Sequence, residues 1–444
     1  MLASCKKDSD VNLEPYTVQN EVRDSAYLKI KDIYLWSDIL PSIREFRPRD
    51  SEDIYEVMTK VRSYQPLDRF SFVETKEETE RASQGLTSDY GFLVKFHTSL
   101  TDLRVNYVYP LSPGGNKGVK RGWRIQSING RKLDGSKQED KDYINEIFFG
   151  SSSSAKFTFL KPDGSVLTST INKGVYPLST VLFKNVYNAG SRKVGYFVYN
   201  QFSGPASVQE LIVTMNYFQS NGVNDIIVDL RYNRGGYVST QDTLANMLAP
   251  KSVGRGQKLM YTYEFNKRYS ASNENTLFYK TGSINLSRIV FIVTPASASA
   301  SELLINNLKP VLDVKLVGEE RTFGKPVGFF PIPVFQYNIY PVSFRTVNSA
   351  GTADYYQGFE VDKNTIDDLS YDFGNLNEAS LKEALKYLNT GSFSAITQKR
   401  IVSTKGVTEF DLLDANADLD KFVPKIEIED RLRKMPSSIR ELQR

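Results

Sequence analysis

The sequence predicts a multidomain α+β fold, and three observations support this prediction. The chain has 444 residues, which corresponds to roughly three domains at about 150 residues each. Hydrophobic residues make up 40% of it and aromatic residues 12%, enough for a sizeable core. The apolar pattern changes twice, from helical spacing to short strands and then to strands that alternate with helices. We therefore expect a helical domain at 23–85, a β-rich domain at 86–178 and an α/β domain at 179–391.

The helical domain is predicted from apolar residues that recur three and four positions apart within 27–34 and 54–61. Pro41 and Pro48 interrupt this pattern, so we expect about three short helices. Nothing in the region suggests catalysis, and its simplest role is packing or docking.

Short strands are predicted for the second domain. Residues 90–96 alternate between polar and apolar, and a second strand-like segment follows at 104–109. Asn129-Gly130, which lies between apolar residues, is typical of a tight hairpin. With a helix expected near 144–148 and a closing hairpin at 155–164, the pattern indicates a small β-rich domain.

The third domain is predicted to contain a sheet with covering helices, because strands and helices alternate along it. Strand-like segments lie at 193–199, 225–231 and 288–293. The segment 225–231 has an apolar centre without alternation, as a strand buried on both faces requires. Between the first two strands, residues 207–219 carry an apolar stripe at helical spacing.

Charge and rare residues exclude several classes of function. The 56 Lys and Arg residues nearly balance the 52 Asp and Glu residues, which argues against a large phosphate-binding surface, and no nucleic-acid partner is expected. The single cysteine, Cys5, excludes an internal disulfide framework, and with the single histidine, His97, it cannot form the usual zinc sites. We expect no metal and no other cofactor. Because a hydrolytic triad could use only His97, any hydrolytic chemistry is expected to need another base.

Three segments that follow strands carry the candidate catalytic groups. Gly235 and Gly236 follow the second strand, and paired glycines let backbone N–H groups point into one space, as an oxyanion hole requires. The segment 294–302, with serines at 297, 299 and 301, lies between the strand at 288–293 and a predicted helix, so a hydroxyl of this segment would lie near the positive end of that helix. The alternative is structural, since Ser299 and Glu302 also fit a capping box.

Lys325 is the third candidate. It is surrounded in the sequence by the apolar residues Phe323, Val327, Phe329 and Phe330. Such surroundings favour the neutral amine, which is the form of lysine that acts as a general base. The alternative is a solvated lysine in a turn.

Together these segments resemble the C-terminal processing (tail-specific) peptidases, over residues 23–390. The similarity lies in the paired glycines, Ser-Ala-Ser-Ala-Ser-Glu at 297–302 and Thr-Phe-Gly-Lys at 322–325. It implies a ClpP/crotonase-like peptidase core in which Ser299 is the nucleophile and Lys325 its general base. The implied oxyanion donors are the N–H of Ala300 and that of Gly235 or Gly236. Many members carry Gln four residues after the lysine, where this chain has Phe329; Gln336 or another group would have to replace it.

The β-rich block resembles a PDZ domain, although Trp123 stands where Asp is usual. The similarity lies in the segment 112–125 and in the Asn-Gly hairpin that follows it. It implies that this domain binds the C-terminus of a protein or peptide as an added strand. The loop expected to do so contains Tyr90, Gly91, Phe92 and Leu93. A generic small β-rich domain is the alternative.

The N-terminus resembles the lipobox of bacterial lipoproteins, with Leu2-Ala3-Ser4 before Cys5. This implies a lipidated Cys5, a tether within 1–22, and anchoring in the bacterial cell envelope as a periplasmic or outer-membrane lipoprotein. A chance tetrapeptide is the alternative. No stretch approaches the roughly 20 apolar residues of a membrane span. Residues 392–444 are polar and charged and form an extension to which no role is assigned.

The function expected from these features is that of a serine endopeptidase that recognises substrates at their C-termini and cleaves them through an acyl-enzyme. One alternative, motivated by Phe329, is a catalytically inactive lipoprotein that binds peptides or ligands. Another is a scaffold whose helical and PDZ-like domains recruit partners. The sequence assigns no oligomeric state.

Overall fold

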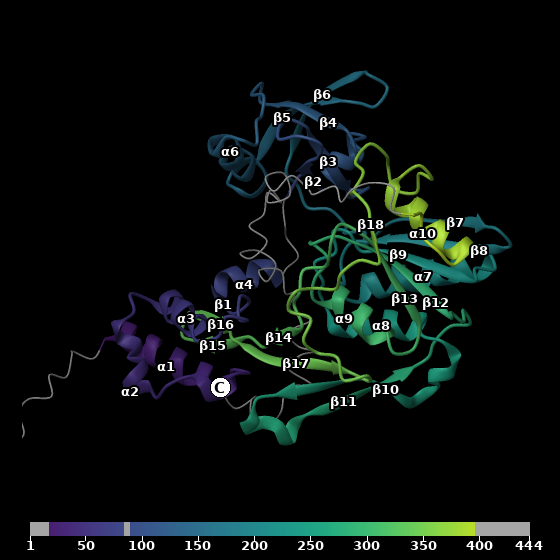
Figure 1. The fold of residues 1–444 in the computed structure, drawn as a ribbon. Coiled ribbons are helices and arrows are strands. Elements are labelled where there is room, and N and C mark those ends of the chain that lie inside the picture. The colour runs from purple at the N-terminus through teal and green to yellow at the C-terminus, as the bar shows by residue number, and fades with distance from the viewer. Residues whose placement is uncertain (1–16, 84–88, 396–444) are drawn as a thin grey trace, which may run out of the picture.

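The structure is a computed structural model that describes residues 17–83 and 89–395 (Figure 1). Cys5, most of the predicted tether and residues 396–444 of the predicted extension lie outside the described residues. In the part of the chain that the structure describes, no helix combines the length and the apolarity needed to cross a membrane.

The N-terminal region contains helices of unequal length. Its elements are α1 (Val18–Ile33), η1 (Ser37–Ile39), α2 (Ile43–Phe46), η2 (Pro48–Asp50) and α3 (Ile54–Ser63). Pro41 lies between η1 and α2, and Pro48 begins η2, so both prolines interrupt the helices where expected. The strand β1 (Phe72–Thr75) and the helix α4 (Lys76–Ser83) follow.

The N-terminal helices share a hydrophobic core with the α/β part of the chain. Tyr27 of α1 and Val57 of α3 belong to the same buried cluster as Val228 and Leu304. In addition, β1 pairs antiparallel with β16 (Tyr337–Tyr340), which in turn pairs with β15 (Ile332–Val334). The helical region is therefore packed into the body of the molecule and contacts the segment that follows Lys325.

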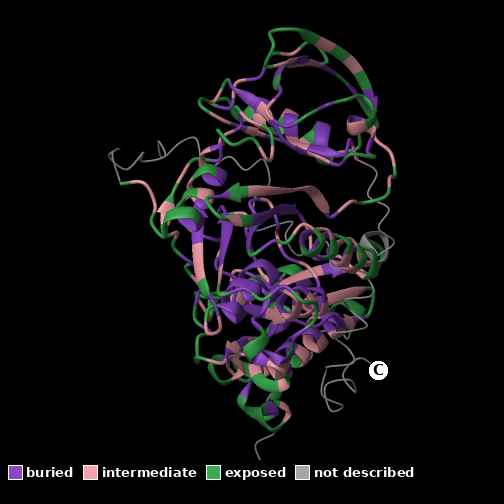
Figure 2. Ribbon diagram, turned by 90° about the vertical axis from the view of Figure 1, so that its right-hand side faces the viewer, coloured by how far each residue is buried: buried purple, intermediate pink, exposed green. Residues whose placement is uncertain are grey.

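The β-rich region forms a five-stranded antiparallel sheet with the strand order β2-β3-β4-β5-β6. Its elements are β2 (Phe92–Phe96), β3 (Leu103–Val108), α5 (Pro113–Asn116), β4 (Arg124–Ile128), α6 (Gln138–Phe149), β5 (Ser154–Leu160) and β6 (Val166–Asn172). It has a core of its own, and Figure 2 shows buried segments within this unit. In this core the ring of Phe92 packs edge to face against Phe148 and Phe157. Asn129 (φ 52°) and Gly130 (φ 83°) make the predicted tight turn.

The α/β region contains a six-stranded sheet with the order β18-β13-β12-β9-β8-β7. All neighbours in it are parallel except β7, which is antiparallel to β8. The strands are β7 (Val181–Ala189), β8 (Arg192–Tyr199), β9 (Asp225–Asp229), β12 (Arg288–Val293), β13 (Asp313–Gly318) and β18 (Lys363–Asn364). The predicted buried strand is β9, in which all five residues are buried.

Helices cover both faces of this sheet, which explains why β9 lacks alternation. Ile226 and Val228 pack in the cluster that contains residues of α7 (Pro205–Ser220), α8 (Val238–Leu248) and α9 (Ala300–Leu308). Ile227 packs in the opposite cluster, with residues of α10 (Ala379–Thr390).

A further sheet, with the order β11-β10-β17-β14, extends from this body. Its strands are β10 (Arg255–Phe265), β11 (Glu274–Tyr279), β14 (Val327–Phe329) and β17 (Val342–Asn348), and the short helices η3 (Lys251–Val253) and η4 (Lys267–Ser272) flank β10. Because β14 begins two residues after Lys325, this sheet fixes the chain on the far side of the lysine.

Candidate active site

The three candidate segments meet at one edge of the six-stranded sheet. They follow β9, β12 and β13, which are parallel neighbours, so their carboxyl ends lie at the same edge. Two backbone hydrogen bonds join them: the N–H of Ala298 donates to the carbonyl of Asn233 (3.1 Å), and the N–H of Phe323 donates to that of Ser297 (3.0 Å). The structure thus brings together the loops that carry the paired glycines, Ser299 and Lys325.

Ser299 has a strained backbone, with φ 55° and ψ −114°, directly before helix α9. L-residues rarely adopt a positive φ, and such a conformation costs about 1–3 kcal/mol. Strain of this kind persists only where the surroundings hold it, and it is concentrated at functional sites. The conformation places the partly exposed serine at the positive end of the helix, as predicted.

Gly235 lies against the serine. A Cβ atom at this position would be 2.8 Å from the Cβ of Ser299 and 2.9 Å from the backbone nitrogen of Ala300. With φ 105° as well, only glycine fits there.

The predicted oxyanion donors differ in whether their N–H groups are already engaged in hydrogen bonds. The N–H of Gly235 donates to the side-chain oxygen of Asn233 (2.9 Å), so this donor is engaged within its own loop. Gly236 follows with φ 131°, and a Cβ atom at this position would lie 2.1 Å from the carbonyl oxygen of Phe202. Ala300 is the first residue of helix α9, where backbone N–H groups have no acceptor within the helix. The candidate oxyanion hole therefore rests on Gly236 and Ala300.

Glu302 joins the serine loop to the lysine loop. Its Oε2 accepts hydrogen bonds from the backbone N–H of Ser299 (3.2 Å) and of Lys325 (2.8 Å). Its Oε1 accepts from the N–H of Gly324 (2.6 Å) and from the hydroxyl of Thr322 (2.6 Å). Sequence reasoning assigned Glu302 only a capping role, because its bonds to 322–325 come from a segment twenty residues further along.

Burial raises the pKa of Glu302 from 4.5 to about 7, although its four hydrogen bonds act in the opposite direction. The side chain is fully buried, so water does not screen it.

Lys325 is buried, with 6% of its surface exposed. Its Nζ lies over the face of the Phe329 ring, 4.5 Å from the centre, and 5.8 Å from the centre of the Phe70 ring. The predicted apolar surroundings are thus present. Gln336 is exposed in the turn between β15 and β16, where its carbonyl accepts from the N–H of Lys76 (2.8 Å), and Phe329 lies over the lysine instead.

Arg69, from the segment between α3 and β1, holds the lysine loop from outside. Its Nη2 donates to the carbonyls of Phe323 (2.7 Å), Gly324 (3.3 Å) and Tyr356 (3.3 Å). Its guanidinium also lies 4.6 Å from the centre of the Phe323 ring. Sequence reasoning missed Arg69 and Phe70, since they belong to a region without any catalytic motif.

The predicted peptide-binding loop lies directly before and at the start of β2. Tyr90 and Phe92 are buried in the core of the β-rich unit, so their side chains support the loop from inside. Gly91 has φ 74°, and its N–H donates to the carboxylate of Asp89 (2.6 Å). Leu93 is half-buried. Within the described sheet β2 pairs only with β3, so its other edge is the place where a peptide strand could add.

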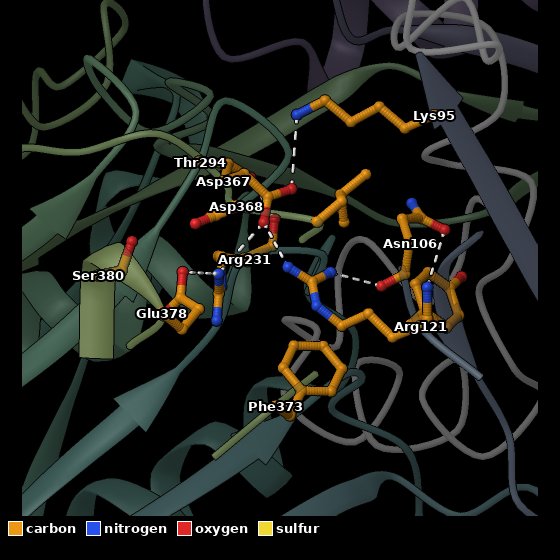
Figure 3. Close-up of polar contacts among 12 residues, drawn as sticks. Lys95, Asn106, Arg121, Arg231, Thr294, Asp367, Asp368, Phe373, Glu378 and Ser380 are labelled. Carbon is orange, nitrogen blue, oxygen red and sulfur yellow. Dashed lines mark hydrogen bonds and ion pairs between the residues drawn. The ribbon is translucent and has the colours of Figure 1, made fainter. Parts of the chain in front are cut away.

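A buried ion-pair network joins the β-rich unit to the glycine loop (Figure 3). Arg121, which lies before β4, donates to Asp367 (2.7 Å) and to the hydroxyl of Tyr232 (2.5 Å). The same hydroxyl donates to Asp367 (2.5 Å), which also accepts from Arg231 (3.1 Å). Because Arg231 and Tyr232 directly precede the glycine loop, the network bonds the β-rich unit to the chain next to that loop.

Charges in this network are balanced. Burial alone would raise the pKa of Asp367, but Arg121, Lys95 and Arg231 outweigh it and hold that pKa well below its usual range. Arg231 makes two further buried pairs, with Asp229 (2.6 Å) and Glu378 (2.8 Å).

The only histidine of the chain belongs to the same interface. The Nε2 of His97 lies 3.9 Å from Asp368, and burial lowers the pKa of His97. In the described ranges, 17–83 and 89–395, no group of three or more His, Cys, Asp or Glu side chains is placed to hold a metal ion.

Comparison with known proteins gives similarity to one peptidase family. Residues 193–347 match the model of peptidase family S41. A carboxyl-terminal-processing protease of a Picosynechococcus species is 26% identical over 264 residues, which cover 59% of each chain. A probable CtpA-like serine protease of Staphylococcus aureus is 22% identical over 319 residues, 69% of this chain and 58% of the relative. The chain therefore spans less than two thirds of the length of either relative.

Two solved structures have a similar fold. A putative S41 protease from Bacteroides fragilis has a TM-score of 0.66 and 24% identity, covering 83% of this chain and 97% of that one. The photosystem II D1 C-terminal processing protease has a TM-score of 0.51 and 18% identity, covering 80% of this chain and 94% of that one. The comparisons confirm the resemblance to C-terminal processing peptidases and the mixed α/β fold. The PDZ resemblance and the lipobox remain predictions.

Proposed function

Because residues 193–347 match the model of peptidase family S41, we propose that the chain is a serine endopeptidase that uses Ser299 and Lys325 as a catalytic dyad. The observation that carries this proposal is the shared carboxylate of Glu302. One of its oxygens accepts from the backbone N–H of both candidate residues, so the two loops are held as a unit. A helix cap alone would need only the bond to Ser299.

The proposed reaction proceeds through an acyl-enzyme. The Oγ of Ser299 attacks the scissile carbonyl carbon while the neutral amine of Lys325 takes the hydroxyl proton. The negative charge that forms on the carbonyl oxygen is stabilised by the N–H of Ala300, with Gly236, and by the dipole of α9. The Lys325 ammonium then gives its proton to the leaving amine as the peptide bond breaks. Water, deprotonated by Lys325, hydrolyses the ester, and the proton returns to Ser299.

The proposed substrates are proteins or peptides that are recognised at their C-termini by the PDZ-like unit. Support comes from the position of β2 at the edge of its sheet, where an extended peptide can add as a further strand. The loop formed by residues 90–93 would then lie beside the terminal carboxylate of the bound peptide. We also propose anchoring to the cell envelope through a lipidated Cys5, on the sequence alone.

A second candidate function is that of an inactive relative that binds peptides without cleaving them. The observation that favours it is that the apolar ring of Phe329 lies over Lys325. Many C-terminal processing peptidases have a hydrogen-bonding glutamine at this position.

Cleavage of an unfolded reporter with an apolar C-terminal tail separates the two functions. The wild type is compared with Ser299→Ala and Lys325→Ala, and a fluorophosphonate probe reports the reactivity of the serine. Cleavage and labelling by the wild type alone support the dyad. Tail binding without cleavage or labelling, across several tails, supports the binding protein. Cleavage by all three proteins would contradict the site assignment.

A further inference from the structure

The amine of Lys325 lies among aromatic rings. Its Nζ is 4.5 Å from the centre of the Phe329 ring and 5.8 Å from that of Phe70. Both distances are within the roughly 6 Å at which a ring face attracts a cation. Lys325 is buried, and this attraction is stronger in a desolvated site than at an exposed one.

The ring of Phe329 is itself held in place from two sides. It is 2% exposed and packs edge to face against Phe72 of β1 (5.3 Å, 81°) and Tyr340 of β16 (5.6 Å, 82°). These two rings stack on each other at 4.4 Å with an interplanar angle of 2°. Rings from two further strands, β1 and β16, therefore fix the orientation of the Phe329 ring.

Phe70 comes from the N-terminal region and is equally constrained. It is 4% exposed, and its backbone N–H donates to the carboxylate of Asp68 (3.1 Å). The preceding residue, Arg69, binds the carbonyls of Phe323 and Gly324 in the lysine loop. The segment 69–70 thus contacts both the backbone that leads to Lys325 and its amine.

We propose that Phe329, assisted by Phe70, is the positioning residue that holds the Lys325 ammonium during proton transfer. This role rests on the proposed Ser-Lys mechanism. When Ser299 gives its proton to the lysine, the neutral amine becomes a cation, and the ring faces attract the cation but not the amine. An attraction that appears only as the proton moves stabilises the transition state relative to the ground state, and so raises kcat.

The test compares ring-deleting and ring-keeping variants in the full chain. Phe329→Leu removes the ring face, whereas Phe329→Tyr keeps it. Phe278→Leu is the matched control, because Phe278 is a fully buried ring in β11. We expect Phe329→Leu to lower kcat about tenfold with KM within about twofold, and Phe329→Tyr to keep kcat within about threefold. Phe278→Leu, with a comparable loss of thermal stability, should keep kcat.

A second measurement does not depend on activity. In protein labelled with ε-13C lysine, the Lys325 methylene resonance is assigned by its absence from Lys325→Arg. Ring-current shielding should move this resonance upfield in the wild type and in Phe329→Tyr, and most of the shift should be lost in Phe329→Leu. The position of the resonance reports the ring face directly.

Three results would overturn the proposal: an unchanged lysine resonance in Phe329→Leu, an equal loss of kcat in Phe329→Leu and Phe278→Leu, or a loss in Phe329→Tyr as large as in Phe329→Leu. If the wild type cleaves nothing, the proposed peptidase function fails. The resonance then decides on its own whether the rings position the lysine.

Discussion

Replacing Glu302 by glutamine perturbs the one side chain that binds both candidate catalytic loops. The carboxylate accepts four hydrogen bonds, two on each oxygen. An amide has only one oxygen, which can keep the N–H groups of Ser299 and Lys325. Its nitrogen would then face the N–H of Gly324, and a buried donor without an acceptor costs about 1–3 kcal/mol.

The glutamine also removes a buried charge, and this effect depends on pH. Burial raises the pKa of Glu302 to about 7 in the folded chain, from 4.5 in the unfolded one. A carboxyl group with a raised pKa stabilises the fold fully below the unfolded value, and this contribution is lost as the pH rises through the folded value. The shift corresponds to about 3 kcal/mol. At pH 8 the wild type bears the penalty for the buried anion, and Glu302→Gln bears the cost of the lost hydrogen bond. Because these two costs are similar, the two proteins should be similarly stable.

At lower pH the wild type should become the more stable protein, by about 2–3 kcal/mol more at pH 5 than at pH 8. Urea unfolding at pH 5, 6, 7 and 8 measures this difference. A Trp123→Phe background leaves Trp36, which packs against the core that contains the site, as the fluorescent reporter. Glu139→Gln, at an exposed side chain, is the control and should give a difference that does not change with pH. A difference between wild type and Glu302→Gln that is constant, or that grows as the pH rises, would refute the reasoning.

Three further predictions concern the backbone of the site and the contact between units. Ser299→Gly and Ser299→Ala should both abolish cleavage, but the glycine variant should be the more stable by about 1 kcal/mol in urea unfolding, because only it relieves the positive φ; equal stability would contradict the strain. Gly235→Ala should lower kcat/KM at least about a hundredfold, since its Cβ would meet the Cβ of Ser299 at 2.8 Å, whereas Gly222→Ala, which also has a positive φ (69°) but meets nothing within 4 Å, should leave it unchanged. Arg121→Ala removes one of the cations that pair with the buried Asp367, while Arg231 and Lys95 remain, and should weaken the contact of the β-rich unit by about 1–3 kcal/mol, seen as faster proteolysis between the units. Arg124→Ala removes a half-exposed side chain that pairs with Asp102, and this variant should be proteolysed between the units at the wild-type rate.

Much of the fold could be predicted because its signals are local. The buried strand β9 is recognisable from a continuous apolar run, and the turn at Asn129-Gly130 from two residues that accept a positive φ. The serine segment 297–301 and Lys325 could be singled out for the same reason, and the resemblance to the peptidase family then chose Ser299 among the serines. Each lies in a short motif next to a strand or helix whose period is visible in the sequence.

The partners of these residues could not be predicted, since they come from distant segments. Glu302 fits a local cap, and only the folded chain shows that it also binds the backbone of Lys325. Phe70 and Arg69 belong to the N-terminal region, and no periodic pattern records that they reach the lysine loop.

The sequence by itself determined which chemical groups are available: a serine before a helix, a lysine among apolar residues, paired glycines, and a single histidine. Those follow from composition and short-range pattern. The tertiary structure decided how these groups are held, because a buried carboxylate and a ring face act over a few ångströms in space, whatever their separation along the chain. The clearest case is Phe329, which in the sequence is only a departure from the family pattern and in the fold lies 4.5 Å from the lysine amine.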